Sequence, residues 1–399
     1  MARRPPLPAY GPLRDQAERD RYADIISECF GMTVAEGRVW LARTEPDRLR
    51  GWRDGRGRLL GGLNLLALGQ WFGGRCVPMG GISAVGVPPE ARGRGVARAL
   101  MDAAVAELAA SGVPLSTLYP ASTALYRRSG YELAGSRFEV SIDLPRLRVH
   151  TPELRLRAAT PADDAAIEEV AARHASLRNG QARRDPYLWG RVRSPRAGSA
   201  RGFVVEERGR LTGHVFVEQK ALVRGHYDLN LTDVCALTPA AARAILSFLA
   251  GHATMADHAL WAGSPGDVLL ALLPERHYTL RLLDPWMTRI VDVRAALESR
   301  GWPAGMRADL RLAVSDELIP ANRGTFRLQV SGGEAKVTRV PGAPAAALSM
   351  HVRGLAPLYT GHMSPRELEL AGLLAGPEPA LEIAAALFAA PAPTMLDMF

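Results

Sequence analysis

The chain has 399 residues, of which 47% are hydrophobic and 23% charged, and its formal net charge is +8. This length predicts two or three domains, and the composition is that of a globular protein. The excess positive charge is almost entirely arginine, because Lys220 and Lys336 are the only lysines. The arginines are dispersed among acidic residues, which is typical of a solvated surface, so we predict no nucleic-acid partner.

The cysteines and histidines indicate neither a disulfide framework nor a metal site. Three cysteines lie far apart and form no C-x-x-C pattern: Cys29, Cys76 and Cys235. Four histidines show no metal-ligand spacing: His174, His214, His226 and His277. No apolar leader follows the start of the chain, and no stretch approaches the length of a membrane span. We therefore expect a cytoplasmic protein without a metal and without a membrane partner.

Residues 1–145 predict a first domain. A Pro-rich lead is followed by two helices, and the second begins at Thr33, a suitable N-cap with Glu36 three residues on. The pattern then predicts strands, a strand–turn–helix unit, another strand, a short helix and closing strands. The expected helices span 22–30, 33–41, 96–108 and 122–128, and the expected strands lie at 59–68, 76–77, 82–87, 114–119, 131–133 and 138–142.

Residues 82–101 are the most informative stretch. A short apolar run stops at Pro88-Pro89, Gly93 and Gly95 follow, and a helical pattern begins at Val96. Glycines let the backbone approach a ligand, and the first N–H groups of a helix have no partner within it. These groups and the positive end of the helix dipole predict an anion site suited to a pyrophosphate.

The same turn also carries a motif. It contains neither G-x-x-x-x-G-K-[ST] nor a complete G-x-G-x-x-G. Arg92-x-x-Gly95-x-Ala97 instead resembles the Q/R-x-x-G-x-G/A signature of the GNAT superfamily of acyl-CoA-dependent N-acyltransferases. The order of the predicted elements in residues 1–145 is also the GNAT order.

Residues 146–290 predict a second, GNAT-like domain. Strands are expected at 154–157, 202–206, 213–217 and 229–237, with helices around 165–170 and over 240–250. Thr238-Pro239 precedes the later helix, and no glycine pair stands there. We expect this domain to lack the cofactor turn and to bind no cofactor.

Residues 291–399 predict a third domain of the α+β class. Strands at 310–316, 324–330, 333–340 and 347–352 include a hairpin with a Ser331-Gly332-Gly333 turn. Helices over 354–359, 364–374 and 379–388 follow, which is typical of a sheet covered by helices. The chain then ends in an apolar segment, Met395 to Phe399.

The whole chain resembles the Eis (enhanced intracellular survival) acetyltransferases. The matches are Ser83-x-Val85-x-Val87-x-Pro89 with Arg92-x-x-Gly95, Tyr126-x-Arg128-x-Gly130-Tyr131, residues 293–301, Leu358-Tyr-Thr-Gly361 and a terminal phenylalanine. The resemblance implies tandem GNAT-like domains, each a mixed, mostly antiparallel sheet flanked by helices, and a sterol-carrier-protein-like α+β domain. It also implies a homohexamer that uses acetyl-CoA to acetylate several amines of aminoglycosides or, in some members, lysine.

For the donor, the expected contacts are with the 82–98 stretch and the start of the short helix. Backbone groups of Val85 and Val87 can pair with the pantetheine arm as if it were an added strand. Residues 92–98 would hold the diphosphate, with arginines adding charge. The complete predicted set is Val85, Gly86, Val87, Arg92, Gly93, Arg94, Gly95, Val96, Ala97, Arg98, Ala121 and Ser122.

Two residues are predicted to be catalytic. Tyr126, matched to the family's tyrosine, is the expected general acid, because a phenol with a pKa near ~10 stays protonated and can protonate a leaving thiolate. Tyr119 and Tyr131 are explained as strand packing. The α-carboxylate of Phe399, with an ordinary pKa near ~3.5, is the expected acceptor of the amine proton.

The predicted acceptor site combines acidic and aromatic walls, which suit a polycationic amine. Its candidates are Asp24, Glu28, Glu36, Trp40 and Asp397, with backbone N–H groups of Ser83 and Ala84 for the oxyanion. The chain departs from the best-known family pattern at three places. Met398 replaces an acid, Ala84 a bulky aromatic, and Ala121 a serine.

These observations predict an acetyl-CoA-dependent N-acetyltransferase acting on aminoglycoside-like polyamines, at one or several amines, and so inactivating antibiotics. Two alternatives remain open from the sequence. One is a protein or peptide lysine N-acetyltransferase on the same scaffold. The other is a non-enzymatic lipid carrier based on the third domain, which would need a cavity empty of its own side chains.

Overall fold

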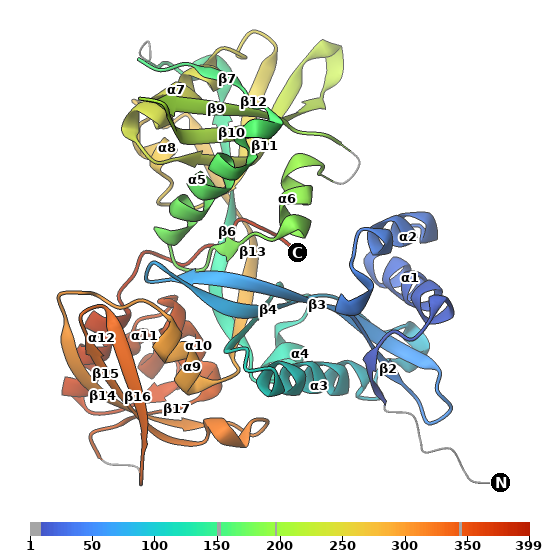
Figure 1. Cartoon of the computed structure of the whole chain (residues 1–399), viewed down its shortest axis with the longest axis vertical. Coiled ribbons are helices and arrows are strands. Elements are labelled where there is room, and N and C mark those ends of the chain that lie inside the picture. Colours follow the sequence, from blue (N-terminus) through green and yellow to red (C-terminus); the bar gives the residue numbers. More distant parts are fainter. Residues whose placement is uncertain (1–8, 150–152, 196–197, 343–344) are drawn as a thin grey trace.

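The computed structural model describes residues 9–149, 153–195, 198–342 and 345–399 (Figure 1). The Pro-rich lead predicted at the start falls mainly in residues 1–8, outside the described residues. Three lobes surround the C-terminus, which lies near the centre of the molecule (Figure 1). Two lobes share one 13-stranded sheet, and the third is built on a separate five-stranded sheet.

The first lobe carries the elements that were predicted for a GNAT domain, together with two short strands, at residues 10–12 and 49–53, that were not predicted. It contains β1 (Tyr10–Pro12), α1 (Gln16–Phe30), α2 (Val34–Ala42), β2 (Leu49–Arg53), β3 (Leu59–Phe72), β4 (Arg75–Gly86), α3 (Val96–Ala110), β5 (Leu115–Leu118), α4 (Thr123–Arg127) and β6 (Glu132–Asp143). The two closing strands expected at 131–133 and 138–142 form the single strand β6. Helix α3 buries Leu100, Ala104 and Leu108, which recur at the spacing seen in the sequence.

The second lobe has a similar order of strands and helices. It contains β7 (Leu156–Ala158), α5 (Asp164–Ser176), β8 (Ala182–Arg183), α6 (Pro186–Arg193), β9 (Arg201–Glu207), β10 (Arg210–Ala221), β11 (Tyr227–Ala236), α7 (Pro239–Ala250), β12 (Ala256–Gly263), α8 (Val268–Ala271) and β13 (Tyr278–Ile290). Strands β12 and β13 were not predicted from the sequence. Pro285 lies inside β13 between two register shifts, and a proline within an apolar run argues against a strand in sequence reasoning.

Strands β6 and β13 join the first two lobes. The sheet order is β1-β2-β3-β4-β5-β13-β6-β12-β11-β10-β9-β7, and β8 pairs with β3. The end of β13 pairs with β5 of the first lobe, and the end of β6 pairs with β12 of the second. Both strands run the length of the contact between the lobes (Figure 1). The two GNAT-like units are therefore hydrogen-bonded into one body.

The third lobe is a sheet covered by helices, as the sequence predicts. It contains α9 (Val293–Ser299), β14 (Arg307–Ser315), β15 (Gly324–Ser331), β16 (Glu334–Val340), β17 (Leu348–His351), α10 (Val352–Thr360), α11 (Pro365–Leu370), β18 (Leu374–Ala375) and α12 (Glu378–Phe388). Its interior is filled by its own side chains, among them Leu312, Leu328, Leu355, Leu381 and Phe388.

Short 3-10 turns in the described residues lie at Pro46–Arg48, Pro89–Ala91, Leu144–Arg146, Pro161–Asp163, Val223–Gly225 and Pro320–Asn322.

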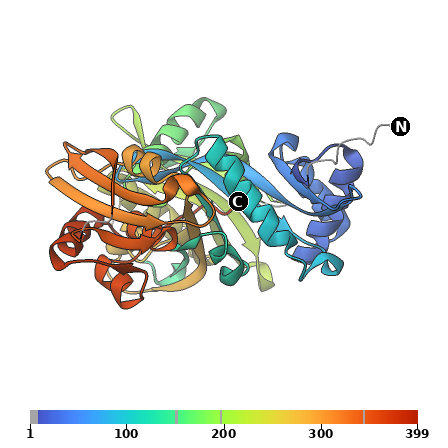
Figure 2. The same ribbon diagram turned by 90° about the horizontal axis from the view of Figure 1, so that it is seen from below.

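The third lobe docks against the first through backbone and charge contacts. Gly301 N donates to Phe72 O at 3.0 Å, and the Phe72 ring meets Tyr359 edge to face. Buried Glu132 accepts hydrogen bonds from Arg127 of its own lobe and from Arg353 of α10. Seen from below, the third lobe lies beside the first two rather than apart from them (Figure 2). The longest helices, α1 and α3, have 15 residues each, and no helix among the described residues is long and apolar enough to cross a bilayer.

Candidate active site

Strand β4 separates from β5 in the first lobe. The two strands pair in parallel from Met79↔Leu115 to Ile82↔Leu118, and no pairing follows in the described residues. Opposite β3, a register shift at Leu63 produces a bulge in which Ala84 has a φ of +51°. Tyr22 holds this bulge by donating to Ala84 O at 2.6 Å. The edge of β4 beyond Ile82, which includes Val85, is thus available to an extended ligand.

The turn that follows β4 leaves its backbone donors open. Gly93 and Gly95 have φ of +72° and +77°, values that only glycine adopts readily. Gly95 is the N-cap of α3 and has no side chain to satisfy the first-turn N–H groups. Of the predicted donor residues here, Val96 is buried and Ala97 half-buried, whereas residues 92–95 and 98 are exposed. The positive end of α3 therefore faces solvent with free donors, as an anion site requires.

The arginines of this turn have different roles. Arg92 Nε donates to Val87 O at 3.1 Å, so part of its guanidinium holds the turn itself. Arg98 lies 3.4 Å from Asp102 one helical turn away, and Arg94 is exposed. Gly86, between the two valines, is buried because Ile25 of α1 leaves no room for a side chain. Ala121 and Ser122 are exposed at the start of α4.

The corresponding helix start in the second lobe is closed. Thr238 caps α7 by accepting from Ala241 N, and Pro239 at the first position has no N–H. The strand before it resembles β4 in other respects. Its pairing with β10 shifts register between Phe216 and Val217, and it pairs in parallel with β12 only as far as Leu231↔Trp261. The second lobe therefore keeps a bulge and a strand divergence but has lost the free donors.

Three tyrosines lie near the divergence of β4 and β5, and their hydroxyl groups differ. Tyr119 donates to Met395 O and Asp397 O, both at 3.0 Å, and the Tyr131 hydroxyl lies 2.7 Å from Ser116 Oγ. The Tyr126 hydroxyl makes no hydrogen bond to any described residue, although its ring meets Tyr131 edge to face. Burial raises the pKa of Tyr126 to about 12, so it is protonated at neutral pH. Tyr126 is thus a neutral phenol whose hydroxyl is not engaged by the fold.

Residues 391–399, which we call the C-terminal tail, lie between the first two lobes (Figure 1). Gln181 donates to Thr394 O at 2.8 Å, and Tyr119 binds two backbone carbonyls further along. Phe399 is 8% exposed, and its ring packs 6.0 Å from that of Tyr119. A side-chain carbon added at Gly81 of β4 would meet the Phe399 ring at 3.0 Å. The end of the chain is therefore seated on β4 where it separates from β5.

The candidates for the acceptor site are placed differently from one another. Asp24 and Glu28 lie one turn apart on α1, half-buried and exposed, and neither forms an ion pair among the described residues. Glu36 instead completes a capping box with Thr33, and this bond lowers the pKa of its carboxyl. Because capping accounts for Glu36, we leave it out of the proposed acceptor site.

The remaining acceptor candidates have structural partners. Trp40 packs with Ala84 against a small apolar cluster of α1 and β2. The Ser83 hydroxyl accepts from Asn64 at 3.2 Å. Asp397 is half-buried in an ion pair with Arg184 at 2.7 Å rather than exposed as a wall for a cation. Sequence reasoning missed Arg184, because nothing local to residues 182–186 indicates a partner 213 positions away.

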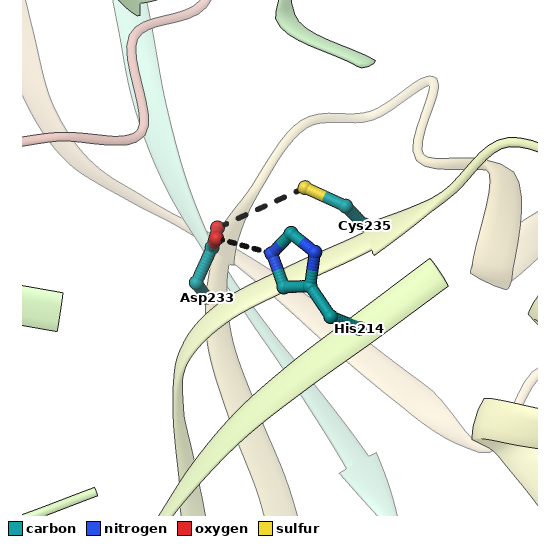
Figure 3. A group of neighbouring side chains, drawn as sticks. All are labelled: His214, Asp233 and Cys235. Atoms are coloured by element: carbon teal, nitrogen blue, oxygen red, sulfur yellow. Dashed lines mark hydrogen bonds and ion pairs between the residues drawn. The ribbon is translucent and has the colours of Figure 1, made fainter. Parts of the chain in front are cut away.

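A buried polar cluster in the second lobe contains the types of side chain that bind metals. His214 Nε2 lies 2.7 Å from Asp233 Oδ2, and Cys235 Sγ is 4.0 Å from Asp233 Oδ1 (Figure 3). Arg184, however, donates to both oxygens of Asp233, at 2.6 and 2.9 Å. Burial raises the pKa of the Cys235 thiol, which favours the neutral form over a thiolate ligand. The arrangement is therefore better described as an arginine–carboxylate–histidine network than as a cation site.

The divergent strand, the open helix start and the neutral tyrosine define an acyl-CoA-dependent N-acyltransferase of the GNAT class. Family models agree with this class: GNAT acetyltransferase domains match residues 12–134 and 180–290, and a sterol carrier protein domain matches residues 293–396.

Comparisons with individual proteins extend over the whole chain. An uncharacterized N-acetyltransferase of Streptomyces avermitilis is 31% identical over 90% of this chain and 91% of its own. N-acetyltransferase Eis of Mycobacterium tuberculosis is 27% identical over 71% of each chain. The crystal structure of a GCN5-related N-acetyltransferase from Anabaena variabilis superimposes with a TM-score of 0.92, at 34% identity and 98% and 99% coverage. The chain belongs to the Eis family of GNAT N-acetyltransferases.

Proposed function

We propose that this N-acetyltransferase transfers the acetyl group of acetyl-CoA to amines of aminoglycoside-like polyamines, at one or several positions. The observation that carries the proposal is the seating of the chain end at the divergence of β4 and β5, in the same lobe as Tyr126. We infer that the α-carboxylate of Phe399 and the neutral phenol of Tyr126 both lie within reach of the strand that would bind the donor. An amine acetyltransferase needs one group of each kind.

On the donor side, GNAT acetyltransferases use acetyl-CoA, and the residues present fit that molecule. The free N–H groups at the start of α3 suit its diphosphate, and Arg94 adds charge without a structural task in the described part of the chain. The unpaired edge of β4 around Val85 and Val87 suits the amides of the pantetheine arm. Backbone N–H groups of Ser83 and Ala84, within the bulge, are the proposed donors to the tetrahedral oxyanion.

For proton transfer, we assign Tyr126 as the general acid and the Phe399 carboxylate as the group that accepts the amine proton. The pKa of about 12 keeps Tyr126 protonated, so it can return a proton to the coenzyme A thiolate. The carboxylate accepts a proton from the ammonium, directly or through water, and the neutral amine attacks the thioester carbon. The C–N bond forms, and the nitrogen of the tetrahedral adduct releases a second proton to water. The adduct then collapses to the amide, and the C–S bond breaks as Tyr126 donates its proton to the thiolate.

On the acceptor side, the proposal relies on the acidic face of α1, formed by half-buried Asp24 and exposed Glu28, and on Trp40 nearby. Acidic and aromatic groups attract a multiply charged amine. Ala84 leaves more space beside the bulge than a bulky aromatic would. Assembly as a homohexamer stays a prediction from the family resemblance, to be checked by light scattering.

The test is to measure thiol release from acetyl-CoA with a panel of aminoglycosides and with a lysine peptide, and to count acetyl groups by mass. We expect turnover with aminoglycosides and one or more added acetyl groups per molecule. Turnover with the peptide alone would replace the proposed acceptor by protein lysine. A lipid that copurifies with the third lobe, together with no thiol release, would support the carrier alternative instead.

A further inference from the structure

We propose that Arg184 is a positioning residue. Its ion pair with Asp397, which we call the clamp, holds the C-terminal tail and so places the Phe399 carboxylate where β4 separates from β5. The inference rests on the proposed function, in which that carboxylate accepts the amine proton. It assigns a task to the second lobe, whose own helix start offers no free donors to a cofactor.

Arg184 is held in place by other residues of the second lobe. Two of its nitrogens bind both oxygens of Asp233, and its guanidinium carbon lies 5.0 Å from the centre of the Trp189 ring. His214 Nε2 also lies 2.7 Å from Asp233 Oδ2 (Figure 3). The guanidinium is planar and cannot turn without breaking the paired bonds to Asp233. Its remaining nitrogen, Nε, therefore points in one direction, and there it binds Asp397 Oδ1 at 2.7 Å.

Asp397 is held on two sides by two different lobes. Arg184, on the second lobe, binds its side chain, and Tyr119, which follows β5 of the first lobe, binds its backbone carbonyl at 3.0 Å. Burial raises the pKa of the Asp397 carboxyl, and Arg184 opposes that rise by stabilising the charged form. Asp397 therefore fixes the tail where the two lobes meet, two residues before the chain ends.

The short remaining length couples this clamp to the proposed base. Two residues span at most about 7 Å, so a shift of Asp397 moves the carboxylate of Phe399 by a similar amount. Met398, between them, is 40% exposed and contributes little burial. A misplacement of about 1 Å in a reacting group can cost on the order of 100-fold in rate. The ion pair is thus close enough to the chain end to control turnover.

The alternative is that the network only stabilises the fold, and a direct test has to separate the two. Removing Arg184 would leave two buried carboxylates, Asp233 and Asp397, without their shared cation, and such a variant is expected to unfold. Asp397→Asn is the better probe, because Arg184 keeps both bonds to Asp233. Asp163→Asn is the matched control, since Asp163 pairs with Arg157 at 2.8 Å in another arginine–aspartate pair of the second lobe.

We expect Asp397→Asn to lower kcat by about 10- to 100-fold while the KM for acetyl-CoA changes less than about twofold. Asp397→Glu, which keeps the charge, is expected to restore part of the rate. Carboxypeptidase should release Phe399 faster from Asp397→Asn than from the wild type or Asp163→Asn. A wild-type kcat for Asp397→Asn, or an equal loss in Asp163→Asn, would overturn the proposal.

Making the same substitution in a chain with an extended C-terminus distinguishes this inference from the assignment of the base. Two glycines added after Phe399 move the carboxylate away, and in that chain Asp397→Asn should lower kcat less than about twofold further. The same 10- to 100-fold loss in both backgrounds would show that Asp397 acts independently of the carboxylate and would reject the clamp. If the extension alone leaves kcat unchanged, the base assignment itself fails, whatever Asp397→Asn does. If the extension lowers kcat and Asp397→Asn does not, only the clamp fails.

Discussion

Replacing Tyr126 by Phe tests the proposed acid with little structural disturbance. The hydroxyl makes no hydrogen bond to a described residue, so its removal should leave stability nearly unchanged. Water, a much weaker acid than a phenol with a pKa of about 12, then becomes the donor. A positioned general acid contributes about 100-fold or more, and 100-fold corresponds to roughly 3 kcal/mol in the barrier. We therefore expect a loss of about 100-fold in kcat.

The assay is thiol release at saturating acetyl-CoA and amine, with the KM for acetyl-CoA measured in parallel. Tyr131→Phe is a matched control, because it removes a phenol in the same cluster that is already bound to Ser116. That control should lose stability, by about 1 kcal/mol, more than it loses rate. A Tyr126→Phe enzyme within threefold of the wild-type kcat would refute the assignment of the acid.

Three further predictions concern contacts that hold the site in place. Gly301→Ala should lower the free energy of unfolding by about 1–3 kcal/mol, because the added carbon would stand 1.9 Å from Gly73 O; Gly305→Ala, with open space around it, should be neutral in the same thermal melt. Burial raises the pKa of Glu132, but hydrogen bonds from two arginines outweigh it and lower the pKa overall, so its stabilisation is present above pH ~4.3 and is lost as pH falls through the lowered value. Glu132→Gln should therefore be less stable at pH 7 and should show a flatter loss of stability below about pH 4 in acid titrations followed by circular dichroism. Gly95→Asp should raise the KM for acetyl-CoA by at least about tenfold, because its carboxylate would occupy the free donors of α3 and repel a diphosphate; an unchanged KM would argue against the anion site.

The features that sequence reasoning predicted are those specified by neighbouring residues. The turn at Gly93 and Gly95 needs only two glycines, a preceding strand and a following helix, all within 20 positions. The closed helix start of the second lobe is equally local, since Thr238 and Pro239 stand where the free donors would be. Glu36 shows the limit of such reasoning, because the same residue fits a capping box and an acidic pocket wall. Only the fold decided between the two, in favour of the cap.

The features that were missed depend on pairings between distant segments. Strand β13 was not predicted because Pro285 interrupts its pattern. In the structure the proline lies between two register shifts in the pairing with β6, and the pairing with β5 begins after it, at Met287. The ion pair of Arg184 with Asp397 joins residues 213 positions apart. Neither residue belongs to a sequence motif, and neither one alone indicates an ion pair. A seated tail could be expected from its apolar ending, but the residue that clamps it could not.

The shared strands give the tail that we propose as part of the catalytic site a fixed surface on which to lie. A carboxylate at the end of a chain is normally mobile, and its contribution depends on how many independent contacts restrict it. Here the tail crosses the surface where β6 and β13 join the first two lobes into one sheet, so its partners on either side, Tyr119 and Arg184, cannot move apart freely. The third lobe supplies the tail and is itself anchored to the first at Gly301 and Glu132. Loosening the contact at Gly301 or at Glu132 would move the start of the tail, while the ion pair between Arg184 and Asp397 stays in place. Turnover should consequently be more sensitive to the docking of the third lobe than binding of the donor, which uses β4 and α3 alone.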